Sequence, residues 1–454
     1  MALFLEEISS ADKRLEPLAR SVLNSVKLHQ LVLSVFTLSL TLSVIIIEEI
    51  LNTRAETADD RRDCPFCTRH LESKGKVPRG MKTLIGKIHW KRRVRRCENG
   101  CPVGLVAPFD EELGIKPNQR TGTEVKYLGC LLAVFVPYKI AESLLGNFFC
   151  VGVSDGAIWN WVREAGGKAM RMLETELEQL RNGENPEEDG AIAQIANLPL
   201  IAGADGVMVP FRPDGGNPDG KTVWREVKVG IVARMGRRIN KKGKEVSVMV
   251  RRRVVAVLGK VDEFKPVLWL LSVKEGIGRC KTAVWLSDGG KGFWRIYREH
   301  FSAYAIGVLD YYHAVQNVWK GTKGWLDGRT KKAALWFKDA RKRIRNNGTK
   351  GVMEELRGVL ATERLSDDCQ KALETLLGYL ENHVDHMKYA DYKKLGLPIG
   401  SGIVESTCKW LIQQRFKGVG MRWSENGFVL LCSLRVAWVN ESFHELFFDD
   451  VPPK

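Results

Sequence analysis

Three carboxylates stand at positions where the sequence predicts a change of backbone element. Asp205 follows the mostly apolar run 198–204, and Asp288 follows a second apolar run, so both aspartates are predicted at strand ends. Glu405 comes a few residues after the breaker segment 398–402, where an amphipathic pattern predicts the start of a helix. Two strand ends and one packed helix could therefore deliver the three side chains to one point.

Carboxylates at one point indicate a particular chemistry. Oxygen ligands suit Mg²⁺ or Mn²⁺, and two such ions about 3.5–4 Å apart activate a water or a 3′-hydroxyl and stabilise the leaving oxygen. If Asp205, Asp288 and Glu405 converge, the chain holds two divalent ions and cuts or joins phosphodiesters. Two alternatives stay open. Asp-Gly pairs are also ordinary turn signals, and Asp310, which ends a further apolar strand, could replace Asp288 as the second ligand.

The sequence between the carboxylates predicts the sheet that would position them. Segments 207–211, 223–234 and 246–258 are rich in β-branched residues and are separated by Gly- or Lys-rich turns, which predicts antiparallel strands. A helix, the strand before Asp288, a short helix and a strand over 303–309 follow. This is the element order of a ribonuclease-H-like sheet. The next stretch has helical patterning without a strand run, and we interpret it as an all-α insertion.

Cysteine spacing predicts a second metal site upstream. Two close pairs flank a hairpin-length segment, which is typical of a zinc ribbon that encloses a tetrahedral, structural Zn²⁺ with no position left for water. Four unrelated reduced cysteines or two disulfides are the alternatives, and His70 and His89 are possible substitute ligands with poorer spacing. The predicted zinc ligands are Cys64, Cys67, Cys97 and Cys101.

Basic residues suit a polyanionic partner. The 454 residues include 70 Lys and Arg against 54 Asp and Glu, a net charge of +16. Segment 87–96 alternates apolar and basic residues, as a strand with one cationic face would. Helices predicted at 127–136, 141–145 and 154–165 suggest a helix-turn-helix, although packing explains their tryptophans equally well. The predicted double-stranded DNA contacts are Lys91, Arg92, Arg93, Arg95, Arg96, Ser154, Trp159, Arg163, Arg415, Lys417 and Arg422.

One apolar segment approaches the length of a membrane span. Leu31 to Ile47 is seventeen residues without a charge, but it contains five Ser and Thr residues and lacks a signal-type cleavage pattern. We expect a buried or oligomerising helix here. The corresponding expectation for the protein is the bacterial cytoplasm, in association with the nucleoid, without a membrane partner.

Four ordered blocks carry a family resemblance: ADGVMVP at 204–210, SDG at 287–289, LDYYH at 309–313 and PIGSGIVES at 398–406. Together they resemble bacterial insertion-sequence transposases of the ISKra type, relatives of the Mutator-like group, over most of the chain from about Cys64 onward. The resemblance implies a DDE transposase that hydrolyses DNA at transposon terminal inverted repeats and then joins the freed 3′-hydroxyl to target DNA. Asp205, Asp288 and Glu405 would be the catalytic triad. The auxiliary pair would be Asp310 and His313.

The sequence patterns predict an α/β multidomain protein with two Mg²⁺ or Mn²⁺ ions and a structural Zn²⁺, and the family resemblance implies that it works as a DDE transposase in a homo-oligomeric assembly. A catalytically inactive, transposase-derived DNA-binding protein and a DNA nuclease without strand transfer are the alternative functions. The predicted domains are an N-terminal helical region (1–60), a zinc ribbon (61–118), a helix-turn-helix region (119–182), the first part of a ribonuclease-H-like core (191–313), an all-α insertion (314–397) and the C-terminal helices of the core with the catalytic Glu (398–454).

Overall fold

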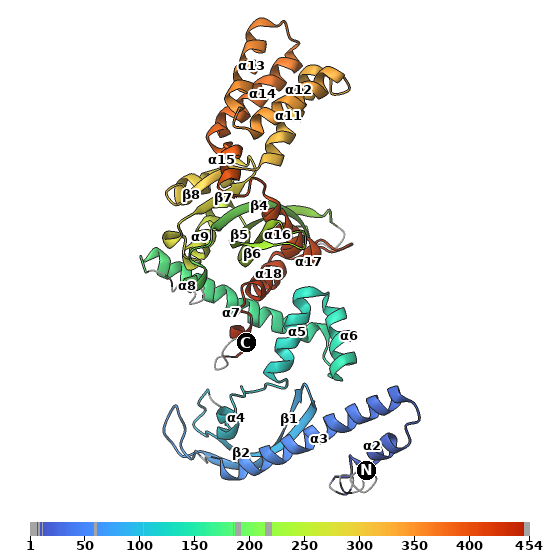
Figure 1. Cartoon of the computed structure of the whole chain (residues 1–454). Helices are drawn as coiled ribbons and strands as arrows, with labels where there is room; N and C mark the ends of the chain where they lie inside the picture. The colour runs from blue at the N-terminus through green and yellow to red at the C-terminus, as the bar shows by residue number, and fades with distance from the viewer. Residues whose placement is uncertain are drawn as a thin grey trace. The chain divides into compact units, whose positions relative to one another are not determined.

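The chain divides into two compact units in a computed structural model (Figure 1). One unit is Met1–Val162 with Phe447–Lys454, and the other is Arg163–Leu446. The structure describes residues 12–58, 61–102, 104–184, 192–213 and 220–448, together with residues 7, 10 and 186.

The first unit contains a small antiparallel sheet with strand order β1-β2-β3. Helix α3 lies along the side of β2 that β1 does not pair. The backbone N–H of His89 donates to Glu48 at 2.8 Å, and that of Lys91 donates to Asn52 at 3.0 Å, so helix side chains satisfy the open edge of the strand. The elements are α2 (Glu16–Leu23), α3 (Leu28–Thr57), β1 (Glu72–Thr83), β2 (Gly86–Arg96) and β3 (Leu105–Val106).

The helix expected at residues 31–47 forms as part of α3, but it is not buried within this chain. α3 is long and apolar enough to cross a membrane, and 11% of its most apolar window is buried. Val32 and Leu33 are 57% and 62% exposed. The expectation of a buried helix is therefore wrong, because it is the C-terminal half of α3 that packs on the ribbon. An oligomer interface stays a prediction.

Three further helices of the first unit form where the sequence predicts them, but each is longer than predicted, and a short helix precedes them. Pro137 ends α5, and the next helix starts directly after it. α5 and the first turns of α7 pack closely, because a Cβ on Gly129 would lie 2.8 Å from the Trp161 ring. The elements are α4 (Pro108–Glu112), α5 (Thr123–Phe135), α6 (Tyr138–Phe149) and α7 (Asp155–Arg181), and α7 continues into the second unit.

The second unit is built on a five-stranded sheet with the order β6-β5-β4-β7-β8. β4, β5 and β6 are antiparallel neighbours, whereas β7 and β8 extend the sheet in parallel with β4. In chain order the strands therefore lie 3-2-1-4-5; strands form at the predicted segments, except that the runs 198–204 and 207–211 belong to one continuous strand. Their bounds are β4 (Leu200–Phe211), β5 (Val223–Ile239), β6 (Glu245–Leu258), β7 (Ala283–Ser287) and β8 (Ala305–Leu309).

Helices cover both faces of this sheet. A Cβ on Gly230 would lie 2.7 Å from Leu268 of α9, whereas a Cβ on Gly203 would lie 2.7 Å from Val404 of α16. Gly230 pairs with residue 204 and so shares its face, and successive strand residues point to opposite faces, which places α9 and α16 on opposite sides. Outside the segment between β8 and α16, the helices of this unit that follow α7 are α8 (Ile192–Ile195), α9 (Val261–Lys274), α10 (Lys291–Ile296), α16 (Gly402–Thr407), α17 (Gln414–Phe416) and α18 (Glu425–Val439). The other helical segments are η1 (Ile277–Arg279), η2 (Tyr297–Phe301), η4 (Cys408–Gln413) and η5 (His444–Leu446).

Between β8 and α16 the chain forms a helical bundle, drawn in orange in Figure 1. Residues 311–397, all of them described, contain helices and no strand. Apolar residues of the bundle, including Val318, Leu356 and Leu376, belong to the same buried cluster as the sheet. The helices are α11 (Tyr311–Leu326), α12 (Lys331–Arg345), α13 (Thr349–Thr362), α14 (Asp367–His383), η3 (Val384–His386) and α15 (Tyr389–Lys394).

Candidate active site and metal centre

Asp205 lies inside β4, not at a strand end as the sequence predicts. β5 pairs with all of β4, including Asp205 with Val229, whereas the pairs with β7 stop at Gly203. One continuous strand therefore runs through the predicted break. The half-buried Asp205 carboxylate accepts the backbone N–H of Gly206 at 2.7 Å.

Asp288 directly follows β7, as predicted. Its Oδ1 accepts the N–H of Gly290 at 3.0 Å, and its backbone carbonyl accepts the indole N–H of Trp294 at 2.6 Å, so the turn is fixed while the carboxylate stays half-buried. Gly203 pairs with Leu286 in the parallel register, so the two aspartates each come two residues after this pair. They therefore lie at the same edge of neighbouring strands.

Glu405 is positioned by close packing of α16 on β4. Gly203 allows this approach, because a side chain there would meet both Val404 and the carbonyl oxygen of Leu286 at 2.7 Å. One turn later, the Cys408 thiol lies 3.9 Å from Asp205 Oδ2. Glu405 directly follows Val404 on this helix, its side chain is 43% exposed, and its carboxylate lies 3.8 Å from Lys409 Nζ. The helix thus brings the third carboxylate to the edge that carries the two aspartates.

Electrostatics show that the carboxylates act on one another. Burial raises the pKa of Asp205, and the charges of Asp288 and Glu405 raise it further, although the N–H of Gly206 and the charge of His313 oppose this. The Asp310 carboxylate raises the pKa of His313, and Asp288 and Glu405 add to that rise. Lys409 pairs with Glu405 at 3.8 Å and His313 opposes the rise at Asp205, but the acids still repel one another, which a divalent cation would relieve.

Asp310 occupies a different environment from the other three acids. It is 1% exposed, its Oδ1 accepts the N–H of His313 at 2.7 Å to cap α11, and its Oδ2 accepts the N–H of Ser401. Burial raises the pKa of Asp310, but the hydrogen bonds from His313 and Ser401 outweigh it and lower the pKa to about 2. Between the two residues left open as the second ligand, the geometry therefore favours Asp288, whose carboxylate remains accessible.

The helical insertion contributes two side chains beside Asp288 that sequence reasoning did not place there. A Cβ on Gly289 would lie 2.6 Å from the Tyr379 ring, so α14 packs on the Asp288 turn. Burial raises the pKa of Tyr379 to about 12. Burial also lowers the pKa of His383 to about 4, and the neighbouring His386 adds to this. The His-x-x-His spacing was visible in the sequence, but no local signal indicates that this helix returns to the sheet.

Four cysteines form a compact cluster in the first unit. Their sulphur atoms all lie within 4.8 Å of one another, and no other group of three or more His, Cys, Asp or Glu side chains in the described part of the chain is as compact. All four thiols are free, which argues against the alternative of two disulfides. The possible substitutes are engaged elsewhere, His70 with Asp63 at 3.7 Å and His89 with Glu48 at 3.3 Å. The cluster, which could bind zinc, is Cys64, Cys67, Cys97 and Cys101.

One thiol of the cysteine cluster has a lowered pKa, which favours the binding of a cation. Cys67 Sγ lies 3.6 Å from Cys97 Sγ, and the backbone N–H of Arg69 lowers the pKa of Cys67 to about 7, whereas the hydrogen bond with Cys67 raises the pKa of Cys101 to about 12. A thiolate at neutral pH is the form that binds a metal. The carboxylates Asp205, Asp288 and Glu405 are spread more widely than these sulphurs, so they do not form a comparably tight single-ion cage.

The basic strand of the ribbon alternates as predicted, with one exception in its expected role. Lys91, Arg93 and Arg96 are exposed, and Arg95 is half-buried. Arg92 points to the other face, is 8% exposed and pairs with Asp110 at 3.1 Å. The prediction of Arg92 as a DNA contact is therefore wrong, because strand alternation turns it into the core.

Some of the other predicted DNA contacts are exposed, and others are buried or packed against aromatic rings. Ser154 caps α7 by accepting the N–H of Ala157 at 3.2 Å, and Arg163 is exposed on the same helix. Trp159 packs against Tyr138 with ring centroids 5.8 Å apart. After Glu405, Lys417 and Arg422 are exposed. Arg415 is 2% exposed and lies over the Trp423 ring at 5.2 Å, so its side chain is not available to DNA.

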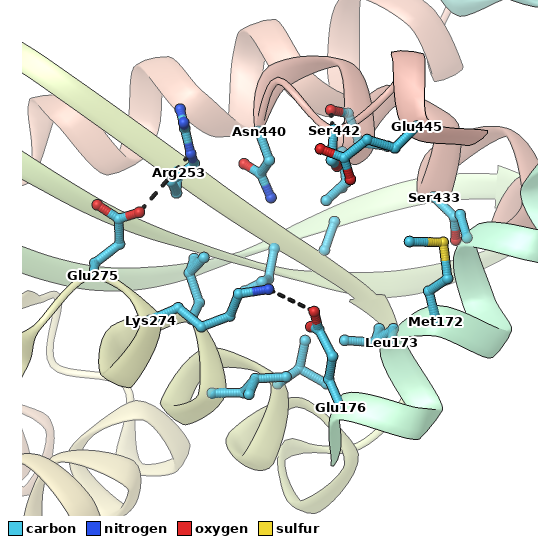
Figure 2. Close-up of a pocket in the computed structure, with 18 of the residues that line it drawn as sticks. Met172, Leu173, Glu176, Arg253, Lys274, Glu275, Ser433, Asn440, Ser442 and Glu445 are labelled. Carbon is cyan, nitrogen blue, oxygen red and sulfur yellow. Dashed lines mark hydrogen bonds and ion pairs between the residues drawn. The ribbon is translucent and has the colours of Figure 1, made fainter. Parts of the chain in front are cut away.

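A cavity of about 310 Å³ lies at the outer edge of β6, between α7, α9 and α18 (Figure 2). Several of its charged groups are already paired. Arg251 makes two hydrogen bonds to Glu275, at 2.9 and 3.0 Å, and Lys274 pairs with Glu176 at 2.6 Å. The cavity is lined by neither predicted aspartate nor Glu405. It is therefore separate from the carboxylate edge.

A comparison with solved structures gives a distant structural similarity. No protein-family model and no curated protein sequence matches the chain. Among solved structures, the Drosophila P element transposase strand transfer complex contains a similar chain, with 10% sequence identity and a TM-score of 0.25, over 74% of this chain and 83% of that one. A TM-score of this size does not establish a shared fold, so the functional assignment depends on the site residues.

Proposed function

We propose that this protein is a DDE-type DNA transposase in which Asp205, Asp288 and Glu405 hold two Mg²⁺ or Mn²⁺ ions. The observation that supports the proposal is that the charges of Asp288 and Glu405, which come from the end of β7 and from α16, both raise the pKa of Asp205 in β4. The strand order 3-2-1-4-5, with the first three strands antiparallel, is the order expected of a ribonuclease-H-like core.

The arrangement supports phosphodiester chemistry in three ways. Two bound divalent ions would activate a water or a 3′-hydroxyl and stabilise the leaving oxygen. Val404, the neighbour of Glu405, packs against Gly203 of β4, two residues before Asp205, so backbone elements hold both acids in place. His313, whose pKa is raised by Asp310, is placed to hold a proton beside the carboxylates. Asp310 acts through His313 and Ser401 and is a positioning residue.

The DNA partner is supported by exposed basic groups in both units. Lys91, Arg93 and Arg96 lie along one strand of the ribbon. Arg163 lies on α7, whose first turn is capped by Ser154, as in the second helix of a helix-turn-helix. We further propose that zinc in the cysteine cluster holds the ribbon, that terminal inverted repeats and target DNA are the substrates, and that the protein works as a homo-oligomer in the bacterial cytoplasm.

A nicking assay tests the proposal. Purified protein is incubated with supercoiled plasmid carrying the inverted repeats that flank the gene, with and without Mg²⁺. The wild type and the control variant Asp367→Ala, which removes an exposed acid from α14, should nick the DNA only with the metal. Asp205→Ala should bind the same DNA without nicking it. Binding without nicking by the wild type would favour the inactive DNA-binding protein.

A second assay separates transposition from plain hydrolysis. A pre-cut repeat end with a labelled 3′-hydroxyl is supplied together with a target plasmid. A transposase joins the label to the plasmid in a metal-dependent reaction that Asp288→Ala and Glu405→Ala abolish. Nicking without any labelled plasmid would favour the nuclease.

A further inference from the structure

The segment that follows the carboxylate helix ends in an exposed apolar tip. We call residues 417–423 the 417–423 loop. Val419 is 107% exposed at its tip, and Gly420 has a positive φ of 73° that turns the chain back. Trp224, at the start of β5, is 53% exposed, and Lys417 Nζ lies 5.4 Å from the centroid of its ring. An aromatic ring and an aliphatic tip therefore face solvent beside a cation.

The base of the 417–423 loop is rigid. The Phe416 ring lies 4.7 Å from Phe428 and 5.1 Å from Trp423. The Trp423 backbone also joins the end of β4, with its N–H donating to the carbonyl of Pro210 at 3.1 Å and its carbonyl accepting from Arg212 at 2.8 Å. A tip held on an ordered aromatic base loses little conformational entropy when it meets a partner.

The charges around the tip favour a polyanion as the partner. Lys417 and Arg422 are exposed on the loop, and Arg422 is oriented by a hydrogen bond from Nη1 to the carbonyl of Gly220 at 3.1 Å. The nearby acid Glu425 is engaged by Arg225. A base offers a flat apolar face between anionic phosphates, which matches an exposed indole flanked by cations. Apolar side chains that enter DNA as wedges are a known means of unstacking it.

The base of the 417–423 loop is separated from the carboxylates by a known length of β4 and of the helical run. Six residues of β4 separate Asp205 from Phe211, roughly 20 Å at about 3.3 Å per residue. The helical run from Glu405 to Phe416 spans roughly 17 Å at about 1.5 Å per residue. B-form DNA advances about 3.4 Å per base step. The base of the loop therefore lies about five or six base steps along a DNA duplex from a phosphate held at the carboxylates.

We propose that Trp224 and Val419 recognise a base that has left the DNA duplex, with the indole stacking on the base and the valine filling the space beside it. This inference rests on the proposed function, because it concerns the DNA of that same site. It identifies locally unpaired DNA as the preferred substrate and assigns the recognition to the 417–423 loop and β5.

The test measures binding without metal, so that no cleavage is required. Fluorescence anisotropy compares two labelled duplexes of equal length, one fully paired and one with a short central mismatch bubble. The wild type should bind the bubble duplex more tightly. Trp224→Ala should weaken bubble binding by roughly five- to a hundredfold, the loss expected for one stacked base, and leave paired-duplex binding within about twofold. Val419→Ser should weaken bubble binding in the same direction.

Two further variants keep the result interpretable. Trp224→Phe retains a stacking ring and should preserve the preference for the bubble duplex, which shows that the site is folded. Ile239→Ala changes an exposed residue, 75% accessible, at the opposite end of β5 and should behave as the wild type. Equal binding of the bubble duplex by wild type and Trp224→Ala, or an equal loss on both duplexes, would overturn the inference. A protein that never nicks DNA but shows the bubble preference would instead overturn only the proposed catalysis.

Discussion

Asp288 and Asp310 should respond in opposite ways to the same isosteric change. Asp288→Asn removes a ligand charge from an accessible, half-buried carboxylate, so we expect metal-dependent nicking to be lost with little change in stability. Asp310→Asn removes the charge from a buried carboxylate whose two oxygens accept the N–H groups of His313 and Ser401. We expect this variant to lose stability first.

The size of the stability loss follows from the pKa of Asp310, which falls from 3.8 to about 2 in the folded protein. A shift of this size corresponds to about 2 kcal/mol of stabilisation by the ionised form. Because the folded pKa is the lower one, this stabilisation is fully present above about pH 4 and disappears as the pH falls through about 2. At neutral pH, Asp310→Asn should unfold roughly 4–8 °C below the wild type.

Thermal unfolding followed by circular dichroism at a series of pH values measures this difference. The gap between wild type and Asp310→Asn should be widest at neutral pH and should close in strong acid, while Asp288→Asn should track the wild type throughout. Nicking assays on the same proteins, run well below their unfolding temperatures, separate folding from catalysis. If Asp310→Asn unfolds with the wild type while Asp288→Asn still nicks DNA, the roles assigned to the two aspartates are reversed.

Three other changes test the remaining contacts. Gly203→Ala forces α16 away from β4, so it should lower the free energy of unfolding by about 1–3 kcal/mol and remove much of the nicking rate. The control Gly358→Ala places a Cβ where nothing lies within 4 Å, so melting and nicking assays should find it unchanged. Native mass spectrometry should find one zinc per chain, and Cys67→Ser should lose it and the protease resistance of the ribbon. Arg92→Ala should destabilise the ribbon by on the order of 3 kcal/mol, while Lys91→Ala should leave melting unchanged and reduce the salt dependence of DNA binding by about one unit of slope.

Local sequence signals were sufficient for the features that depend on neighbouring residues. Cysteine spacing predicted a cluster whose sulphurs do meet, and Ser154 was recognised as the cap of α7 because the capping hydrogen bond spans three residues. Apolar runs followed by Asp-Gly located β7 and its terminal Asp288. Each of these patterns is encoded within a few positions of the chain, so hydropathy and turn propensity can reveal it.

Features that depend on distant partners were not visible. Asp205-Gly206 resembles a strand break, yet β5 supplies partners along the whole of β4 and keeps the strand continuous. Arg92 and Arg415 belong to basic runs, but their burial is decided by Asp110 and by the Trp423 ring, which the sequence does not bring near them. The contact of α14 with the Asp288 turn is equally non-local, since it depends on how the inserted bundle folds back onto the sheet.

The same non-local contacts explain how a catalytic glutamate can follow a long insertion. Asp310 and Ser401 are 91 residues apart, yet the Ser401 N–H donates to the Asp310 carboxylate, and the N–H of Tyr311 donates to the carbonyl of Ile399 at 2.8 Å. The entropic cost of closing a loop grows only slowly with its length. Once the two ends are fastened in this way, the length of the intervening bundle has little influence on where α16 begins. The position of Glu405 is then decided by the Asp310 clamp and by the close approach at Gly203, and these contacts, more than the bundle itself, are what the proposed chemistry requires.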